Sequence, residues 1–277
     1  MKNIDLIVSD LDGTLLMDGE IANDNDRDMI RCLQAQDYKI VLATGRTWYA
    51  ASVAAKELYI DRYVDLVICN NGAIVSKASK YEPIMVKKIA TNVIQELFTL
   101  MIANDICMYA FVADKDAAYW NGVPCPSVNL NKIDWANSFE NLPYQEASDD
   151  VDIVQVMILT PFEKEKQFLE ITKEYRAMLP CIKNDHEDMP FYEFNAENVS
   201  KGSAIEFIAD HLKVDLKKTI AFGDNYNDIS MFDVVGTSIA MDNASDTVKH
   251  KATTTTLSVT DGGVSYYLNQ MIMNLEE

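Results

Sequence analysis

The chain has few residues of the kinds that form cross-links or bind soft metals. Its 277 residues include five cysteines and three histidines. No cysteines stand in Cys-x-x-Cys spacing, and no two histidines stand at the short spacing of a metal-binding pair. We therefore expect neither a disulfide framework nor a zinc or histidine metal centre.

Long apolar runs and basic residues are also scarce. No stretch approaches the ~18 apolar residues of a membrane span, and the first residues lack the apolar region of a signal peptide. The chain carries 24 basic against 43 acidic residues, and the net charge of −19 opposes binding to nucleic acid or anionic membranes. We expect a cytoplasmic protein, on which an anionic ligand would need local positive charge and a divalent cation.

An acidic loop follows the first apolar run. Residues 4–9 (IDLIVS) have the pattern of a buried strand, and residues 10–14 (DLDGT) that of a glycine-containing loop. Ligand sites of α/β sheets lie in the crevice at the carboxyl ends of the strands. Asp10 and Asp12 could divide labour there, because one carboxylate can attack an electrophile or bind a metal while the other moves protons. The alternative is a simple turn in which Asp10 is a cap.

Three later segments place polar side chains just after a strand or just before a helix. They are Thr44-Gly45-Arg46 after the apolar residues 40–43, NVSKG at 198–202 before a helical pattern at 204–212, and GDNYND at 223–228 after the apolar residues 219–222. Separate turns rarely produce such a set by chance, so the combination favours one shared site.

Together these segments resemble the four motifs of the haloacid dehalogenase superfamily of phosphohydrolases. Residues 70–73 (NNGA) and 240–244 (AMDNA) are similar to the Cof-type (class IIB) branch, in which a large cap is inserted between the threonine and lysine motifs. The resemblance implies an α/β fold with a Rossmann-like core, built on a parallel sheet, and an inserted α+β cap domain.

The patterns along the chain agree with that organisation. Strands alternate with helices over residues 1–82 and end in a hairpin, which indicates a parallel sheet. We expect the core at 1–85 and 191–277, resuming with residues 191–194 (FYEF), and the cap at 86–190. Expected helices are 24–36 (capped by Asn23 or Asp24), 47–58, 91–103 and 163–178; expected strands include 64–69, 106–112 and 152–159, with polar turns over 121–150.

The resemblance also implies a role for each motif residue. Asp10 would attack phosphorus and form an aspartyl phosphate, and Asp12 would protonate the leaving alcohol and then deprotonate water. Mg²⁺ would be bound by Asp10, Asp224, the backbone carbonyl of Asp12 and, directly or through water, Asp228. The phosphoryl group would be bound by Thr44, Gly45, Lys201, Asn227 and the backbone around Leu11.

Several of these residues have a structural alternative. Thr44 could cap the following helix, Asp228 could cap a helix at 229–234, and Lys201 could be a solvated lysine, although a cation is disfavoured at a helix start. Arg46 could pair with an acid and orient its loop. Asn71 and Asn243 are interpreted as residues that shape loops.

One position departs from the family pattern. Asn225 stands where a glycine is usual, and asparagine tolerates a left-handed backbone better than most residues. The departure leaves the geometry of the metal loop open.

The sequence as a whole predicts a Mg²⁺-dependent phosphatase acting on a small phosphorylated metabolite, with sugar phosphates as the expected class. Within the superfamily that the sequence resembles, dehalogenases lack the second acid, so the resemblance together with Asp12 favours release of an alcohol from a phosphate ester. A phosphomutase and a noncatalytic phosphometabolite-binding protein are the alternatives. No obligate protein partner is evident.

Overall fold

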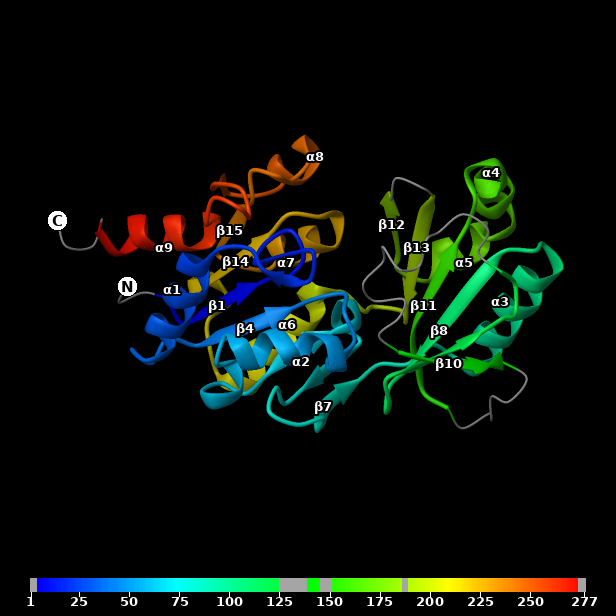
Figure 1. Cartoon of the computed structure of the whole chain (residues 1–277), viewed down its shortest axis with the longest axis horizontal. Coiled ribbons are helices and arrows are strands. Elements are labelled where there is room, and N and C mark those ends of the chain that lie inside the picture. Colours follow the sequence, from blue (N-terminus) through cyan, green and yellow to red (C-terminus); the bar gives the residue numbers. More distant parts are fainter. Residues whose placement is uncertain (1–3, 125–138, 145–150, 186–188, 274–277) are drawn as a thin grey trace. The chain divides into compact units, whose positions relative to one another are not determined.

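The computed structural model describes residues 4–124, 139–144, 151–185 and 189–273. The chain divides into two compact units. The first contains the residues up to Ile84 and those from Ser200 onward, and the second contains Met85–Val199. Each unit is built around a sheet of its own (Figure 1).

The first unit is built on an eight-stranded sheet in the order β16-β15-β14-β1-β4-β5-β6-β7. The strands are β1 (Leu6–Ser9), β4 (Ile40–Ala43), β5 (Val67–Cys69), β6 (Ile74–Ser76), β7 (Pro83–Val86), β14 (Thr219–Gly223), β15 (Thr237–Ala240) and β16 (Thr254–Thr255). The pairs from β16 through β5 are parallel, and β5 pairs with β6 in the antiparallel sense. β1 is fully buried between β14 and β4, so the first acidic loop leaves from the middle of the sheet.

Helices flank this sheet (Figure 1). They are α1 (Asp24–Gln34), α2 (Trp48–Glu57), α6 (Lys201–Leu212), α7 (Ile229–Phe232), α8 (Asp246–Lys249) and α9 (Gly263–Met273), with short 3₁₀ turns η1 (Ile60–Arg62), η2 (Asn70–Gly72), η5 (Leu216–Lys218) and η6 (Tyr226–Asp228). The small hairpin of β2 (Leu16–Met17) and β3 (Glu20–Ile21) follows the first loop. Asn23 caps α1 by accepting a hydrogen bond from the backbone N–H of Asn25, as expected from the sequence.

The second unit contains a six-stranded sheet in the order β10-β9-β8-β11-β13-β12. Its strands are β8 (Cys107–Val112), β9 (Ala117–Trp120), β10 (Glu140–Pro143), β11 (Ile153–Leu159), β12 (Cys181–Asp185) and β13 (Pro190–Asn195), and its helices are α3 (Thr91–Ala103), α4 (Phe162–Ile171) and α5 (Lys173–Met178). The sheet is antiparallel except for the β9–β10 pair. The mixture of helices with an antiparallel sheet is the α+β insertion that the sequence predicts.

The structure corrects three expectations. Residues 191–194 do not return to the first sheet, because β13 pairs with β11 and β12 of the second unit. The expected helix 163–178 is divided into α4 and α5 at Thr172. The expected turns at 121–150 include the strand β10, and the rest of that segment at 125–138 and 145–150 lies outside the described residues.

None of the helices in the described part of the chain is both long and apolar enough to cross a membrane.

Candidate active site

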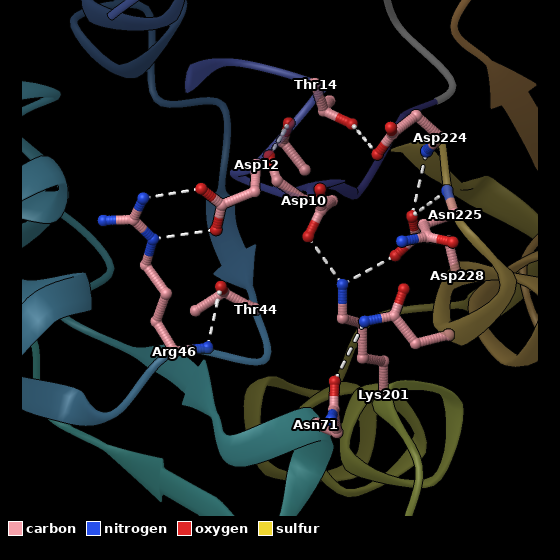
Figure 2. A network of polar contacts seen from close by, with 12 residues as sticks. Asp10, Asp12, Thr14, Thr44, Arg46, Asn71, Lys201, Asp224, Asn225 and Asp228 are labelled. Carbon is pink, nitrogen blue, oxygen red and sulfur yellow. Dashed lines mark hydrogen bonds and ion pairs between the residues drawn. The ribbon is translucent and has the colours of Figure 1, made fainter. Parts of the chain in front are cut away.

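A buried lysine joins two buried carboxylates at the carboxyl ends of β1 and β14. The ammonium of Lys201 lies 2.5 Å from Oδ1 of Asp10 and 2.7 Å from Oδ1 of Asp228 (Figure 2). Their side chains are 1%, 6% and 0% exposed, in that order. The backbone N–H of Asp10 donates to the carbonyl of Phe222, which extends the β1–β14 ladder into the loop. The motif segments at 10–14, 198–202 and 223–228 therefore meet at one point.

Local packing explains why Lys201 is directed into the protein. It is the first residue of α6, where Ser200 and Ser203 form a reciprocal capping box. A Cβ at Gly202 would lie 2.1 Å from the carbonyl oxygen of Ser230, and one at Gly72 would lie 2.1 Å from that of Ser200. These close approaches fix the start of α6 against the neighbouring loops, so the interpretation of Lys201 as a solvated lysine is wrong.

Burial and mutual charge shift the pKa values of this cluster. Burial opposes the charge on Lys201, but the carboxylates of Asp10 and Asp228 outweigh it and raise its pKa. Burial raises the pKa of Asp10 well above its usual value; Lys201 opposes that shift, and the neighbouring carboxylates add to it. Burial, followed by the charge of Asp228, raises the pKa of Asp224 to about 7. One ammonium therefore does not fully compensate the charge of the acid cluster.

The loop after β14 is organised by Asp228. Its Oδ2 accepts hydrogen bonds from the backbone N–H groups of Asp224 and Asn225, both at 2.9 Å. Asp228 occupies the N-cap position of α7, but its side chain makes no capping hydrogen bond to that helix and instead completes a capping box with Asn225 at η6. Asn225 has φ −123° and ψ 171°, an extended conformation that needs no glycine. The departure from the family pattern at this position is therefore compatible with the loop.

Three carboxylates of the site could hold a metal ion. One oxygen from each of Asp10, Asp224 and Asp228 lies within 4.8 Å of the others. Asp224 also faces the first loop, where the hydroxyl of Thr14 lies 3.5 Å from its Oδ1 (Figure 2). This all-oxygen set suits a hard divalent cation.

The side chain of Asp12 points toward Arg46, which holds it, whereas that of Asp10 points toward Lys201 (Figure 2). The guanidinium forms a two-pronged contact, with Nε 2.7 Å from Oδ2 and Nη2 2.5 Å from Oδ1 of Asp12 (Figure 2). The Asp12 side chain is 52% exposed, so it remains accessible to a ligand. The expectation that Arg46 pairs with an acid is confirmed, and the pairing fixes the direction of Asp12.

The remaining expected residues surround this cluster. Thr44 is buried, and its hydroxyl accepts from the backbone N–H of Arg46, whereas Thr47 caps α2. A Cβ at Gly45 would approach Oδ1 of Asn71 to 3.0 Å. Thr44 is therefore not the cap of the following helix, and Gly45 marks a close approach of two loops.

Asn227 and Leu11 have structural partners. The amide nitrogen of Asn227 donates to Oδ1 of Asn71 at 2.9 Å. The carbonyl of Leu11 accepts from the backbone N–H groups of Thr14, Leu15 and Leu16. These contacts support loop-shaping roles for both residues. If they also bind phosphate, Asn227 would use the second hydrogen of its amide nitrogen, and Leu11 would use its backbone N–H.

The sequence interpretation did not include two further contacts of the site. Thr14 and Asn243 both approach Asp224, from loops far apart in the chain. Thr14 belongs to the first motif and could have been chosen on that basis. The residues Asp242, Asn243 and Ala244 were expected to form a loop, but nothing in the sequence indicated that this loop contacts Asp224.

Comparison with known proteins agrees with the fold. A family model for haloacid dehalogenase-like hydrolases matches residues 7–268. The 5-amino-6-(5-phospho-D-ribitylamino)uracil phosphatase YcsE of Bacillus subtilis is 27% identical over 271 residues, covering 98% of this chain and 97% of the relative. A haloacid dehalogenase-like hydrolase from Bacteroides thetaiotaomicron superposes with a TM-score of 0.81 at 22% identity, covering 97% and 99% of the two chains. A HAD subclass IIB sugar phosphatase gives a TM-score of 0.78 at 22% identity, covering 96% and 98%.

The chain belongs to the haloacid dehalogenase-like hydrolase family. The expected fold class, a Rossmann-like α/β core with an inserted α+β domain, is confirmed. The chain is accordingly an enzyme of the phosphoric monoester hydrolase type.

Proposed function

We propose that this enzyme is a Mg²⁺-dependent phosphatase that hydrolyses phosphate monoesters of small metabolites, with sugar phosphates as the substrate class, through an aspartyl-phosphate intermediate. The observation that carries the proposal is the buried Asp10–Lys201–Asp228 cluster at the end of the parallel strands. It combines a carboxylate that can attack phosphorus with a fixed cation that can attract the phosphoryl oxygens.

The acid cluster fits a Mg²⁺ ion on its own chemistry. Asp10, Asp224 and Asp228 offer carboxylate oxygens, the ligands that Mg²⁺ prefers. Burial raises the pKa of both Asp10 and Asp224, and a divalent cation would offset the excess negative charge that contributes to those shifts. The backbone carbonyl of Asp12 would complete the protein ligands. Once bound, the ion would reduce the repulsion between the carboxylates and the substrate phosphate.

The first half of the proposed reaction uses Asp10 and Asp12. A carboxylate oxygen of Asp10 attacks phosphorus while the bond from phosphorus to the ester oxygen breaks. Asp12, in its protonated form, gives its proton to the departing oxygen, and an alcohol leaves. Arg46 keeps the Asp12 carboxyl in one orientation, and Lys201 and Thr44 bind oxygens of the transferring phosphoryl group.

The second half returns the enzyme to its starting state. Water attacks phosphorus on the aspartyl phosphate and gives a proton to the Asp12 carboxylate. The bond between phosphorus and Asp10 breaks, releasing inorganic phosphate. The same side chain thus acts first as an acid and then as a base.

The substrate class rests on the charge of the chain and on its relatives. The net charge of −19 opposes nucleic acids and favours a small phosphorylated metabolite that is held by local cations. One relative is a phosphatase of a phosphoribityl compound, and one structural neighbour is a sugar phosphatase. Phosphorylated sugars and sugar alcohols are therefore the first compounds to test.

A panel assay tests the proposal. Phosphate release would be measured on sugar, polyol and nucleoside monophosphates, with Mg²⁺ and after exhaustive chelation. We expect turnover of sugar or polyol phosphates with Mg²⁺, none after chelation, and none in Asp10→Asn, whose amide is a poor nucleophile of nearly the same shape. Full activity after chelation, or no hydrolysis of any compound, would contradict the proposal. Turnover without added bisphosphate would also separate a phosphatase from a phosphomutase, and any turnover would exclude a noncatalytic binding protein.

A further inference from the structure

The side chain of Asn243 connects the acid cluster to two other loops of the first unit. Asn243 follows β15, and its Nδ2 donates to the carbonyl of Gly13 at 2.8 Å and to Oδ2 of Asp224 at 3.3 Å. Its Oδ1 accepts from the backbone N–H of Val259 at 2.9 Å. One amide therefore contacts the loop at 10–14, the loop at 223–228 and the segment after β16.

These three contacts agree on a single orientation of the amide. Val259 presents an N–H and requires an acceptor, whereas the Gly13 carbonyl and the Asp224 carboxylate require a donor. Rotating the amide by half a turn would bring like groups together at all three contacts. The orientation of Asn243 is thus set by its neighbours, and both hydrogens of Nδ2 have an acceptor.

Asp224 is held tightly against the first loop at the same place. Gly13 has φ +80°, and a Cβ there would lie 2.1 Å from Oδ2 of Asp224. The hydroxyl of Thr14 lies 3.5 Å from Oδ1. The carboxylate is consequently limited on one side by Gly13 and Thr14, and the donor of Asn243 restrains the oxygen nearest to Gly13.

We propose that Asn243 is a positioning residue that orients the Asp224 carboxylate for the divalent cation and links it to the loop that carries Asp12. The inference rests on the proposed function, in which Asp224 is a Mg²⁺ ligand. Groups that hydrogen-bond to metal ligands fix the direction of the ligand, and losing one commonly weakens metal binding 10- to 100-fold. Asn243 is itself an exposed residue, so its contacts contribute direction more than core packing.

The test compares Asn243→Ala with the wild-type enzyme by titrating Mg²⁺ alone in a calorimeter, without substrate. We expect the dissociation constant for Mg²⁺ to rise by about tenfold or more. The melting temperature of each protein would be measured with and without Mg²⁺, and we expect the Mg²⁺-dependent increase to shrink in the variant. A variant whose metal-free melting temperature falls while its Mg²⁺ dissociation constant stays within about twofold of wild type would show that Asn243 only supports the Val259 turn.

Asn243→Asp provides a second variant, which also serves if the alanine variant does not fold. It has nearly the same shape and can still accept from Val259, but it places an oxygen against the Gly13 carbonyl and the Asp224 carboxylate. We expect kcat at saturating Mg²⁺ to fall about tenfold or more. The added negative charge would attract a cation, so this loss would reflect the orientation of Asp224 and not weaker attraction of the metal. Unchanged kcat would overturn the inference.

Asn269→Asp is the matched control. It adds the same charge on an exposed position of α9, away from these contacts. Its Mg²⁺ dissociation constant and kcat should stay within about twofold of wild type. If the wild-type enzyme itself binds no Mg²⁺, the proposed function fails together with this inference, whereas normal binding in all variants overturns the inference alone.

Discussion

At the scale of single residues, the central feature is a charged lysine inside the protein. Lys201 is placed at the first position of α6, where the helix dipole disfavours a cation, and it is held there by two carboxylates. Removing one member of a buried ion pair costs about 3–5 kcal/mol, because its partner is left buried and uncompensated. Replacing a whole buried ion pair by well-packed apolar residues is, by contrast, often neutral or stabilising. The position of the cluster at the strand ends therefore points to a role in chemistry more than in stability.

The contact between Arg46 and Asp12 leads to a prediction about leaving groups. Arg46→Met would release Asp12 from its fixed direction and impair proton transfer to the departing oxygen. The loss should be about 10²-fold or more for alkyl phosphates, whose leaving alcohol needs the proton. It should be much smaller for p-nitrophenyl phosphate, whose leaving group is stable as an anion.

The measurement is kcat/KM of Arg46→Met and Arg46→Lys on both substrates. The lysine variant retains the charge but not the two-pronged geometry, so it should recover only part of the alkyl-phosphate activity. An equal loss on both substrates would indicate that Arg46 binds phosphate and does not orient the acid.

At the scale of elements, α9 depends on a carboxylate from the opposite end of the chain. Asp26 of α1 is fully buried, and its Oδ1 accepts from the backbone N–H of Ser265 in the first turn of α9 at 2.6 Å. Asp26→Ala removes this cap and should lower the free energy of unfolding by about 1–2 kcal/mol, as cap deletions do. Denaturant unfolding would measure the loss, with the exposed neighbour Asn25→Ala as control. Equal stabilities of the two variants would show that the contact does not secure α9.

The same carboxyl predicts a pH dependence of stability. Burial raises the pKa of Asp26 from its usual 3.8, so the folded state holds the proton more tightly than the unfolded state does. The stability that this proton contributes is complete below pH 3.8 and is lost as the pH rises through the folded-state pKa. Relative to Asp26→Asn, the wild-type protein should lose stability from about pH 4 upward. A constant difference between the two proteins across that range would contradict the shift.

The sequence predicted most of this fold, and the meeting of the motif loops in space, because the informative signals are local. Apolar strands that end in polar loops placed Asp10, Thr44 and Asp224 at the carboxyl ends of the strands of one sheet. Asn23 and Asp24 were the two candidates for the cap of α1, and the structure uses Asn23. Residues 191–194 were assigned to the wrong sheet, because an apolar strand has the same pattern whichever sheet it joins. The contacts of Asp26 with Ser265 and of Asn243 with Gly13 join segments more than 200 residues apart, and no local pattern encodes them.

At the scale of the whole molecule, every residue of the candidate site belongs to the first unit. Because each unit has its own sheet and core, we expect two transitions in differential scanning calorimetry. Mg²⁺ should raise the temperature of only one transition, since a ligand stabilises the unit that binds it. Asp224→Ala, which lacks one of the proposed metal ligands, should lose that increase. A single transition, or a Mg²⁺ effect on both, would contradict the independence of the units.

The most direct test of the account is the mass of the enzyme during turnover. Asp12→Asn should form the aspartyl phosphate from p-nitrophenyl phosphate, which needs no acid, but hydrolyse it slowly because the base is missing. Acid quenching followed by mass spectrometry should then show a phosphoryl group of about 80 Da on the peptide that contains Asp10, together with a burst of about one nitrophenolate per enzyme. Steady nitrophenolate release with no added mass on that peptide would contradict covalent catalysis by Asp10.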